Sequence, residues 1–278
     1  MSLHITTLCE NTASKPDLLA EWGLSLFIQT ETTTILFDTG ASFAAVHNAD
    51  RLGIDLSKID IIVLSHGHVD HTGGLHEILK KTGDVKILAH QDIWDAKYVK
   101  RPNLEKEVFI GIPYVREKLE NIGAHFVHAV EPFQINEDIL TTGEVSMQTE
   151  YEAVENNLFR KNDGIFQQDP LADDLSLIIK TQYGLILILG CAHRGVVNII
   201  RHAQNLIGDD RIYAIIGGIH LYLASPDRIQ KTINELKSVQ PQKIGVSHCT
   251  GFVSSMHIAQ AFPDQFFVNN AGSHFVLG

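Results

Sequence analysis

Residues 64–75 read LSHGHVDHTGGL, and four residues within six positions have side chains that bind metals: His66, His68, Asp70 and His71. The preceding stretch, IDIIVLS (59–65), is Ile, Val or Leu at five of its seven residues, which predicts a buried strand. LHEILKKTG (75–83) has apolar residues at helical spacing before a glycine, which predicts a helix. The motif is therefore expected in a turn between a strand and a helix.

The spacing within this motif suits metal binding. His66 and His68 are two positions apart, and on extended backbone such residues point the same way, so both imidazoles can bind one ion. Asp70 and His71 follow as the chain turns toward the helix, and we expect them to face a second ion. Nitrogen ligands with one carboxylate suit Zn²⁺, Mn²⁺ or Fe, whereas Ca²⁺ and Mg²⁺ prefer oxygen.

Strands and helices alternate on both sides of a less regular middle segment. Around the motif we expect a strand ending in a turn at TTTILFDTG (32–40), a helix at 41–54 and a strand at 85–90. The later elements expected are a hairpin of strands 175–181 and 184–190, a helix at 196–208, a strand at 211–218, a helix at 225–239 with Ser225 as its N-cap, and a strand at 243–248. Residues 92–160 lose this rhythm, so we expect one domain over 1–278 with an inserted segment at about 92–160 that covers the site.

The two halves of the chain share a layout. Asp38 and His66 are 28 positions apart, and Cys191 and His220 are 29 apart; each pair spans a strand end, a helix and a second strand end. This predicts two βαβ-like halves whose strand ends converge on one cleft.

HGHVDH (66–71) resembles the HxHxDH signature of the metallo-β-lactamase superfamily, and FDTG (37–40) resembles the aspartate-containing turn that precedes it there. The resemblance implies an α/β fold, a four-layer αββα sandwich with a metal site at the strand ends. It also implies that His66 and His68 hold one metal, that Asp70 and His71 hold the second, and that Asp38 orients the motif loop.

The other expected ligands depart from the family pattern. LADDLSL (171–177) stands where many members have a histidine, and Cys191 stands where many have a bridging aspartate. Cys191 is either a thiolate ligand or a small buried residue, and we expect His193 to supply the missing histidine. His248 is preferred as the last ligand and His220 as a proton donor or substrate contact; the alternative exchanges these two roles.

Three further stretches of sequence resemble one branch of this superfamily in particular. GCAHRGVVNII (190–200), IIGGIHL (215–221) and SHCTG (247–251) are similar to a branch of the superfamily. That branch includes the archaeal dihydropterin–ribofuranosylaminobenzene phosphate synthases and metal-dependent hydrolases of unknown substrate.

The hypothesis favoured by this reading is a hydrolase of phosphoester-type substrates with two divalent metals, Zn expected and Mn or Fe as alternatives. Asp70 would orient the nucleophile and His220 would protonate the leaving group. One alternative is a transferase that condenses a pterin methyl diphosphate with an aryl carbon. A second is a metal-stabilised binding module without catalysis.

Composition limits the partners and the compartment. The 278 residues carry a formal net charge of −11, which argues against nucleic acid as the main partner and leaves small anionic substrates. Three widely spaced cysteines do not form a disulfide framework. No apolar run approaches the ~18 residues of a membrane span, and the first residues lack a signal-peptide pattern, so we expect a cytoplasmic protein. The oligomeric state is not readable from these features.

Overall fold

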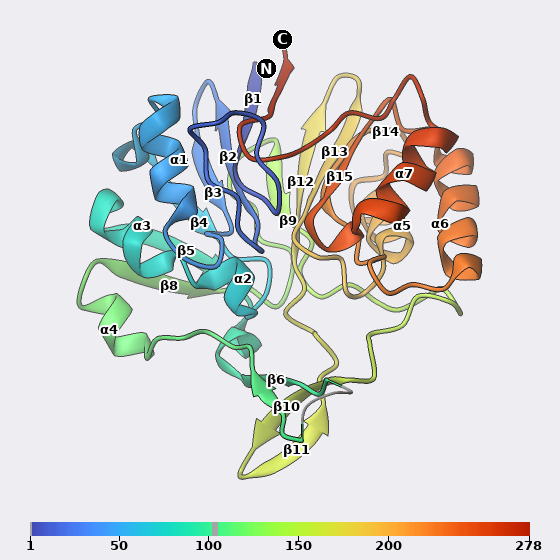
Figure 1. Ribbon diagram of the computed structural model, residues 1–278. Coiled ribbons are helices and arrows are strands. Elements are labelled where there is room, and N and C mark those ends of the chain that lie inside the picture. Colours follow the sequence, from blue (N-terminus) through green and yellow to red (C-terminus); the bar gives the residue numbers. More distant parts are fainter. Residues whose placement is uncertain (1, 102–104) are drawn as a thin grey trace. The chain divides into compact units, whose positions relative to one another are not determined.

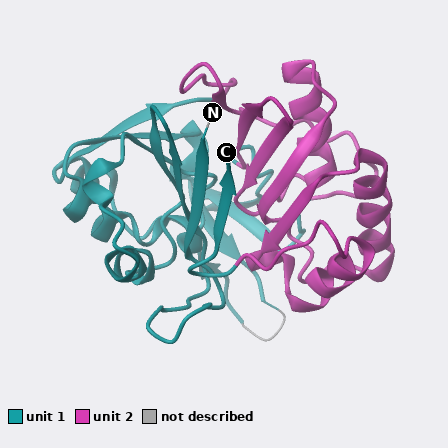
Figure 2. Cartoon of the chain, turned by 90° about the horizontal axis from the view of Figure 1, so that it is seen from above, with its two compact units in different colours: residues 1–129, 154–173, 270–278 teal, residues 130–153, 174–269 magenta. Residues whose placement is uncertain are grey.

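The computed structural model describes residues 2–101 and 105–278, and the chain folds into two compact units. Figure 2 shows unit 1 in teal (residues 1–129, 154–173 and 270–278) and unit 2 in magenta (residues 130–153 and 174–269). Both ends of the chain belong to unit 1, where β16 (His274–Leu277) pairs antiparallel with β1 (Leu3–Cys9). Within the described ranges, no helix is long and apolar enough to span a bilayer.

Unit 1 is built on a seven-stranded sheet of order β16-β1-β2-β3-β4-β5-β8. The strands from β3 to β8 in this order run parallel, and the others pair antiparallel. Their bounds are β2 (Ser25–Thr30), β3 (Thr34–Phe37), β4 (Ile61–Val63), β5 (Val85–Ala89) and β8 (Ala124–His128). Every residue of β3 and β4 is buried, which agrees with their continuous apolar sequences.

Two helices of unit 1, α1 (Ala44–Leu52) and α3 (Leu75–Thr82), lie within the predicted helical ranges. The unit also contains the short helices α2 (Val69–Thr72) and α4 (Arg116–Glu120) and the 3₁₀ turns η1 (Leu56–Lys58) and η2 (Gln91–Trp94). Helix α3 buries Leu75, Ile78 and Leu79 in the core that contains Leu36 of β3 and Ile62 of β4. In Figure 1, α1 and α3 lie on the same side of this sheet.

The segment 92–160 contains more regular structure than its sequence pattern predicted. Its strand β8 completes the sheet of unit 1 beside β5, and its strand β9 (Ile139–Thr141) joins the sheet of unit 2. Among the described strands, a separate small sheet is formed by β6 (Ala96–Val99), β7 (Val108–Phe109), β10 (Leu158–Asn162) and β11 (Ile165–Gln168). Residues 102–104 of the segment lie outside the described residues. That the segment covers a site stays a prediction.

Unit 2 is built on a five-stranded sheet of order β15-β14-β13-β12-β9. Strands β12 (Ser176–Thr181) and β13 (Gly184–Leu189) form the predicted hairpin, and β14 (Ile212–Gly218) and β15 (Lys243–Ser247) follow in parallel. Its helices are α5 (Val196–Ile207), α6 (Pro226–Val239) and α7 (Phe252–Ala261), and η3 (His248–Thr250) is a 3₁₀ turn. The predicted cap of α6 is confirmed, since the Ser225 side chain accepts a hydrogen bond from the Arg228 amide.

The shared layout of the two halves is confirmed. Strand β3, helix α1 and strand β4 form one parallel unit, and β13, α5 and β14 form the other. At the strand ends, the Asp38 amide donates to the Val63 carbonyl oxygen at 2.9 Å, and the Gly218 amide donates to that of Gly190 at 3.1 Å. Both predicted groups of metal ligands begin just past these points.

Candidate metal centre

The first group of candidate ligands, called the His66 group, comprises His66, His68, Asp70 and His71 of unit 1. The chain leaves β4 after Val63 and reaches His68, which is the extended N-cap residue of α2. Asp70 and His71 lie on the single turn of α2, not in an irregular turn.

The side chains of the His66 group converge. The Nε2 atom of His66 lies 3.0 Å from the Nδ1 atom of His68, and the rings of His66 and His71 have centroids 4.2 Å apart. Two nitrogens bound to one tetrahedral zinc lie about 3.3 Å apart, given Zn–N distances of about 2.0–2.1 Å. The Nε2 atom of His71 is 3.9 Å from the Oδ2 atom of Asp70. All three imidazoles are buried, and the Asp70 side chain is 19% exposed.

Asp38 fixes the His66 group in place through hydrogen bonds. Its buried carboxylate accepts hydrogen bonds from the Ser65 amide, the Ser65 hydroxyl and Nδ1 of His71, each at 2.7 Å. Because the hydroxyl proton of Ser65 goes to Asp38, Nδ1 of His66, 2.9 Å from the same hydroxyl, must donate to it. The Nε2 atoms of His66 and His71 therefore keep their lone pairs, which is the tautomer that binds a metal.

A buried ion cluster, which was not predicted from the sequence, also supports the motif loop. The Nζ atom of Lys97 lies 2.9 Å from carboxylate oxygens of both Asp169 and Asp173. The second oxygen of Asp173 accepts a hydrogen bond from the Gly67 amide at 2.8 Å. A side chain at Gly67 would meet the Ile93 carbonyl oxygen at 2.5 Å, so this approach requires glycine. The two adjacent aspartates in the otherwise apolar stretch LADDLSL (171–177) were the sequence feature that could have indicated this cluster.

The second group, called the Cys191 group, lies in unit 2 at the ends of three neighbouring parallel strands. It comprises Cys191 and His193 after β13, His220 after β14, and His248 and Cys249 after β15. The possible donor atoms of Cys191, His248 and Cys249 all lie within 4.8 Å of one another, and so do those of Cys191, His193 and His220. Four of the five residues are buried, and His220 is partly exposed. The structure thus brings together every ligand that we predicted in the second half of the chain.

Backbone conformation at these strand ends is unusual. Asp38, Ala192, His220 and His248 all have positive φ, between 47° and 59°. Such conformations cost non-glycine residues about 1–3 kcal/mol each and persist where surrounding contacts enforce them, often at functional sites. In both units, therefore, the strand ends that carry candidate ligands are shaped by tertiary contacts.

The two groups fit divalent metals by their chemistry. Buried imidazoles with a carboxylate in one unit, and imidazoles with thiols in the other, are the nitrogen, oxygen and sulfur donors that zinc binds. Whether both groups serve the same ions stays a prediction.

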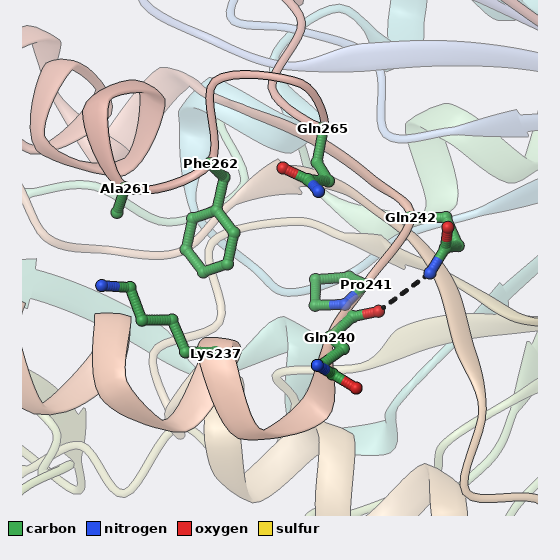
Figure 3. Close-up of a pocket in the computed structure, with 7 residues that line it drawn as sticks. All are labelled: Lys237, Gln240, Pro241, Gln242, Ala261, Phe262 and Gln265. Carbon is green, nitrogen blue, oxygen red and sulfur yellow. Dashed lines mark hydrogen bonds between the residues drawn. The ribbon is translucent and has the colours of Figure 1, made fainter.

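A surface pocket elsewhere in unit 2 offers no comparable chemistry. It lies at the end of α6, where Phe262, Lys237 and several glutamines line it (Figure 3). The Gln242 side chain there donates to the Gln240 carbonyl oxygen at 3.2 Å. Its seven lining residues include no thiol, imidazole or carboxylate, so the pocket is not a candidate metal site.

Comparison with known proteins agrees with this geometry. The family model of the metallo-β-lactamase superfamily matches residues 23–143, which contain the whole His66 group. The chain belongs to the metallo-β-lactamase superfamily. The predicted fold class is confirmed: mixed α/β with two large sheets and flanking helices.

Three individual proteins show how similar the chain is to known sequences and structures. The 7,8-dihydropterin-6-methyl-4-(β-D-ribofuranosyl)-aminobenzene-5'-phosphate synthase of Methanocaldococcus jannaschii is 32% identical, over 98% of this chain and 95% of its own. The crystal structure of Tm1679, a metal-dependent hydrolase of the β-lactamase superfamily, superposes with a TM-score of 0.86 at 26% identity and covers 99% of both chains. The metallo-β-lactamase fold protein YhfI from Bacillus subtilis shares the fold, with a TM-score of 0.60 at 11% identity over the whole of both chains.

Proposed function

We propose that this protein is a metal-dependent hydrolase that acts on small phosphoester-type substrates with two divalent metal ions, zinc expected. The observation that carries the proposal is the His66 group, whose imidazole nitrogens converge while Asp38 and Ser65 fix their tautomers. The similarity to Tm1679, described as a metal-dependent hydrolase, supports the same class.

The proposal assigns a role to each candidate residue. His66, His68, Asp70, His71, His193 and His248 hold the metals, Cys191 is an additional ligand, and Asp38 orients the motif. Such metals lower the pKa of water and polarise the bond that is attacked. Asp70 orients the nucleophile, and His220 donates a proton to the leaving group. The burial of His248 and the partial exposure of His220 favour this division, because a proton donor must reach the substrate.

A second candidate function is supported by the relative of highest identity reported above. That protein is a synthase, and the 32% identity extends over nearly the whole of both chains. In this alternative, metals held by the same residues would activate a pterin methyl diphosphate. The aminobenzene partner would form the new bond to the methyl carbon, with loss of diphosphate and a proton. The net charge of −11 does not separate the alternatives, since both substrates are small anions.

One experiment compares the candidates. The purified protein is analysed for metal content and then assayed against phosphomonoesters, phosphodiesters and the two-substrate condensation. Hydrolysis of a simple ester supports the hydrolase, whereas turnover only when both partners are present supports the synthase. Metal without any turnover would favour a non-catalytic binding module.

Variants of the ligands complete the test. His193→Ala, His248→Ala and Cys191→Ser should each bind less metal than the wild type, and His220→Ala should keep its metal but lose turnover. If His220→Ala lost metal and His248→Ala did not, the roles of these two histidines would be exchanged.

A further inference from the structure

Two of the three cysteines lie together in unit 2. Cys191 follows β13 and Cys249 follows β15, and both are almost fully buried. The Cys249 thiol donates a hydrogen bond to the Cys191 carbonyl oxygen at 3.5 Å and contacts the side chains of Cys191 and His220. Cys191 was expected as a possible ligand, whereas no role was predicted for Cys249.

The donor atoms of Cys191, Cys249 and His248 are close enough to bind one ion. They lie within 4.8 Å of one another. Around a tetrahedral zinc, with Zn–S of about 2.3 Å and Zn–N of about 2.0–2.1 Å, donor atoms are about 3.3–3.8 Å apart. To reach these separations, the three donor atoms need to approach one another by no more than about 1–1.5 Å.

The neighbouring strand is shaped around the Cys249 sulfur. A Cβ atom at Gly218, the last residue of β14, would lie 2.5 Å from the Cys249 Sγ atom and 3.3 Å from the Cys191 Cα atom. Only glycine allows this approach. At the same place His248 and Ala192 have φ values of 53° and 54°, which set the directions of the flanking side chains. The fold thus makes room for a thiol between two strand ends.

We propose that Cys249 is a metal ligand, and that the thiolates of Cys191 and Cys249 and the imidazole of His248 together bind a thiophilic divalent cation such as Zn²⁺. On binding, each thiol releases its proton to solvent and its sulfur forms a bond to the metal. The inference deepens the proposed function and rests on it in one respect, that the chain binds divalent metal. With two thiolates, this site would have softer ligands than the histidine and carboxylate motif alone, and would favour metals that prefer sulfur.

Cobalt substitution tests this directly, because thiolate bound to Co²⁺ gives a strong charge-transfer absorption in the near ultraviolet and imidazole or carboxylate does not. The reduced wild-type protein is loaded with Co²⁺, and absorbance per bound cobalt is recorded for it and for Cys249→Ser, Cys191→Ser and Cys9→Ser. We expect the band in the wild type, roughly half of it in Cys249→Ser or Cys191→Ser, and the full band in Cys9→Ser. Cys9 is the matched control, a buried cysteine outside the group.

A second measurement needs no variant, in case a serine at a buried position prevents folding. X-ray absorption of the zinc-loaded wild type, combined with its zinc content, should show zinc-bound sulfur at about 2.3 Å amounting to two sulfur atoms per protein chain. One zinc-bound sulfur per chain, or none, would overturn the assignment of Cys249.

These measurements distinguish the absence of the sulfur site from the absence of the proposed enzymatic activity. Metal and turnover without the band, or with a full band in Cys249→Ser, would overturn the sulfur site and leave the hydrolase standing. A band that depends on Cys249 in a protein without turnover would support the sulfur site and count against the enzyme. A protein that binds no cobalt or zinc would overturn both.

Discussion

The His66 group and the Cys191 group each lie at the strand ends of a parallel βαβ unit. Different interactions hold the two groups in place. In unit 1, buried charge fixes the motif: Asp38 accepts three hydrogen bonds, and the Lys97 cluster reaches the Gly67 amide. In unit 2, close backbone approach and positive φ angles position the donors, with Gly218 making room for a thiol.

This difference has a chemical reason. The His66 group is local in sequence, so a few carboxylate hydrogen bonds can set the tautomer and direction of neighbouring imidazoles. The Cys191 group is gathered from three separate strand ends, so its geometry depends on the register of β13, β14 and β15. We therefore expect changes of charge to damage the first group most, and changes of volume to damage the second.

Replacing Lys97 with Met should have the largest effect. The change leaves Asp169 and Asp173 buried without their cation, and removing one partner of a buried ion pair costs about 3–5 kcal/mol. Urea unfolding of the wild type and Lys97→Met measures the loss. We also expect lower metal content, because Asp173 positions Gly67. Unchanged stability and metal content would show that buried charge does not hold the His66 group.

The same cluster predicts a dependence on alkaline pH. Burial alone would lower the pKa of Lys97, but the charges of Asp173 and Asp169 outweigh burial and raise the pKa above its usual 10.5. Since the folded-state pKa is the higher one, the stability from Lys97 is fully present below about pH 10.5 and is lost as pH rises through the folded-state pKa. Lys97→Arg keeps its charge there, so its unfolding free energy should fall less than that of the wild type in urea titrations at increasing pH. Parallel pH profiles would contradict this prediction.

Replacing Asp38 with Asn should have the next largest effect. The asparagine amide has the size of the carboxylate, but its NH₂ group would face the Ser65 hydroxyl or the His71 Nδ1–H, which are also donors. The lost hydrogen bonds should lower the free energy of unfolding by about 2–3 kcal/mol. Losing such a carboxylate behind a ligand histidine typically lowers metal affinity about 10–100-fold. Denaturant unfolding and metal titration measure the two effects. Asp60→Asn is a suitable control, because Asp60 accepts from the Thr34 amide in the same unit, outside the group.

Replacing Gly218 with Ala tests the volume argument in unit 2. The added methyl group would overlap the Cys249 sulfur, and overpacking of this kind costs about 1–3 kcal/mol. Metal binding by the Cys191 group should weaken, measured by metal titration. Gly208→Ala is the control: it has positive φ but open space around it, so it should lose a little stability and no metal affinity. Equal metal affinity in both variants would count against a site shaped around the thiol.

Replacing Trp22 with Phe should have the smallest effect. The indole Nε1 of Trp22 donates to the Asp70 carboxylate at 3.1 Å, but the side chain is 52% exposed, so its loss should weaken metal binding by about 1 kcal/mol or less. Metal titration of Trp22→Phe beside Trp94→Phe, the other tryptophan, separates this contact from a general effect of the substitution. A loss as large as that of Asp38→Asn would mean that Trp22 does more than donate one hydrogen bond.

Local sequence patterns by themselves determined much of this protein. The apolar strand before LSHGHVDHTGGL, the helix after it and the two βαβ layouts follow from periodicity, and the structure has them all. The convergence of His66 and His68 likewise follows from two-residue spacing, because neighbouring residues share one short stretch of backbone.

Only the tertiary structure decided the rest. The pairing of β8 beside β5, the contact of Cys249 with Cys191 and the ion pair of Lys97 with Asp173 join residues far apart in the chain. No ion pair was predicted for Lys97, and no role was predicted for Cys249. Their partners come from other strand ends and loops, so their environments depend on sheet register, backbone strain and burial, none of which a local pattern records.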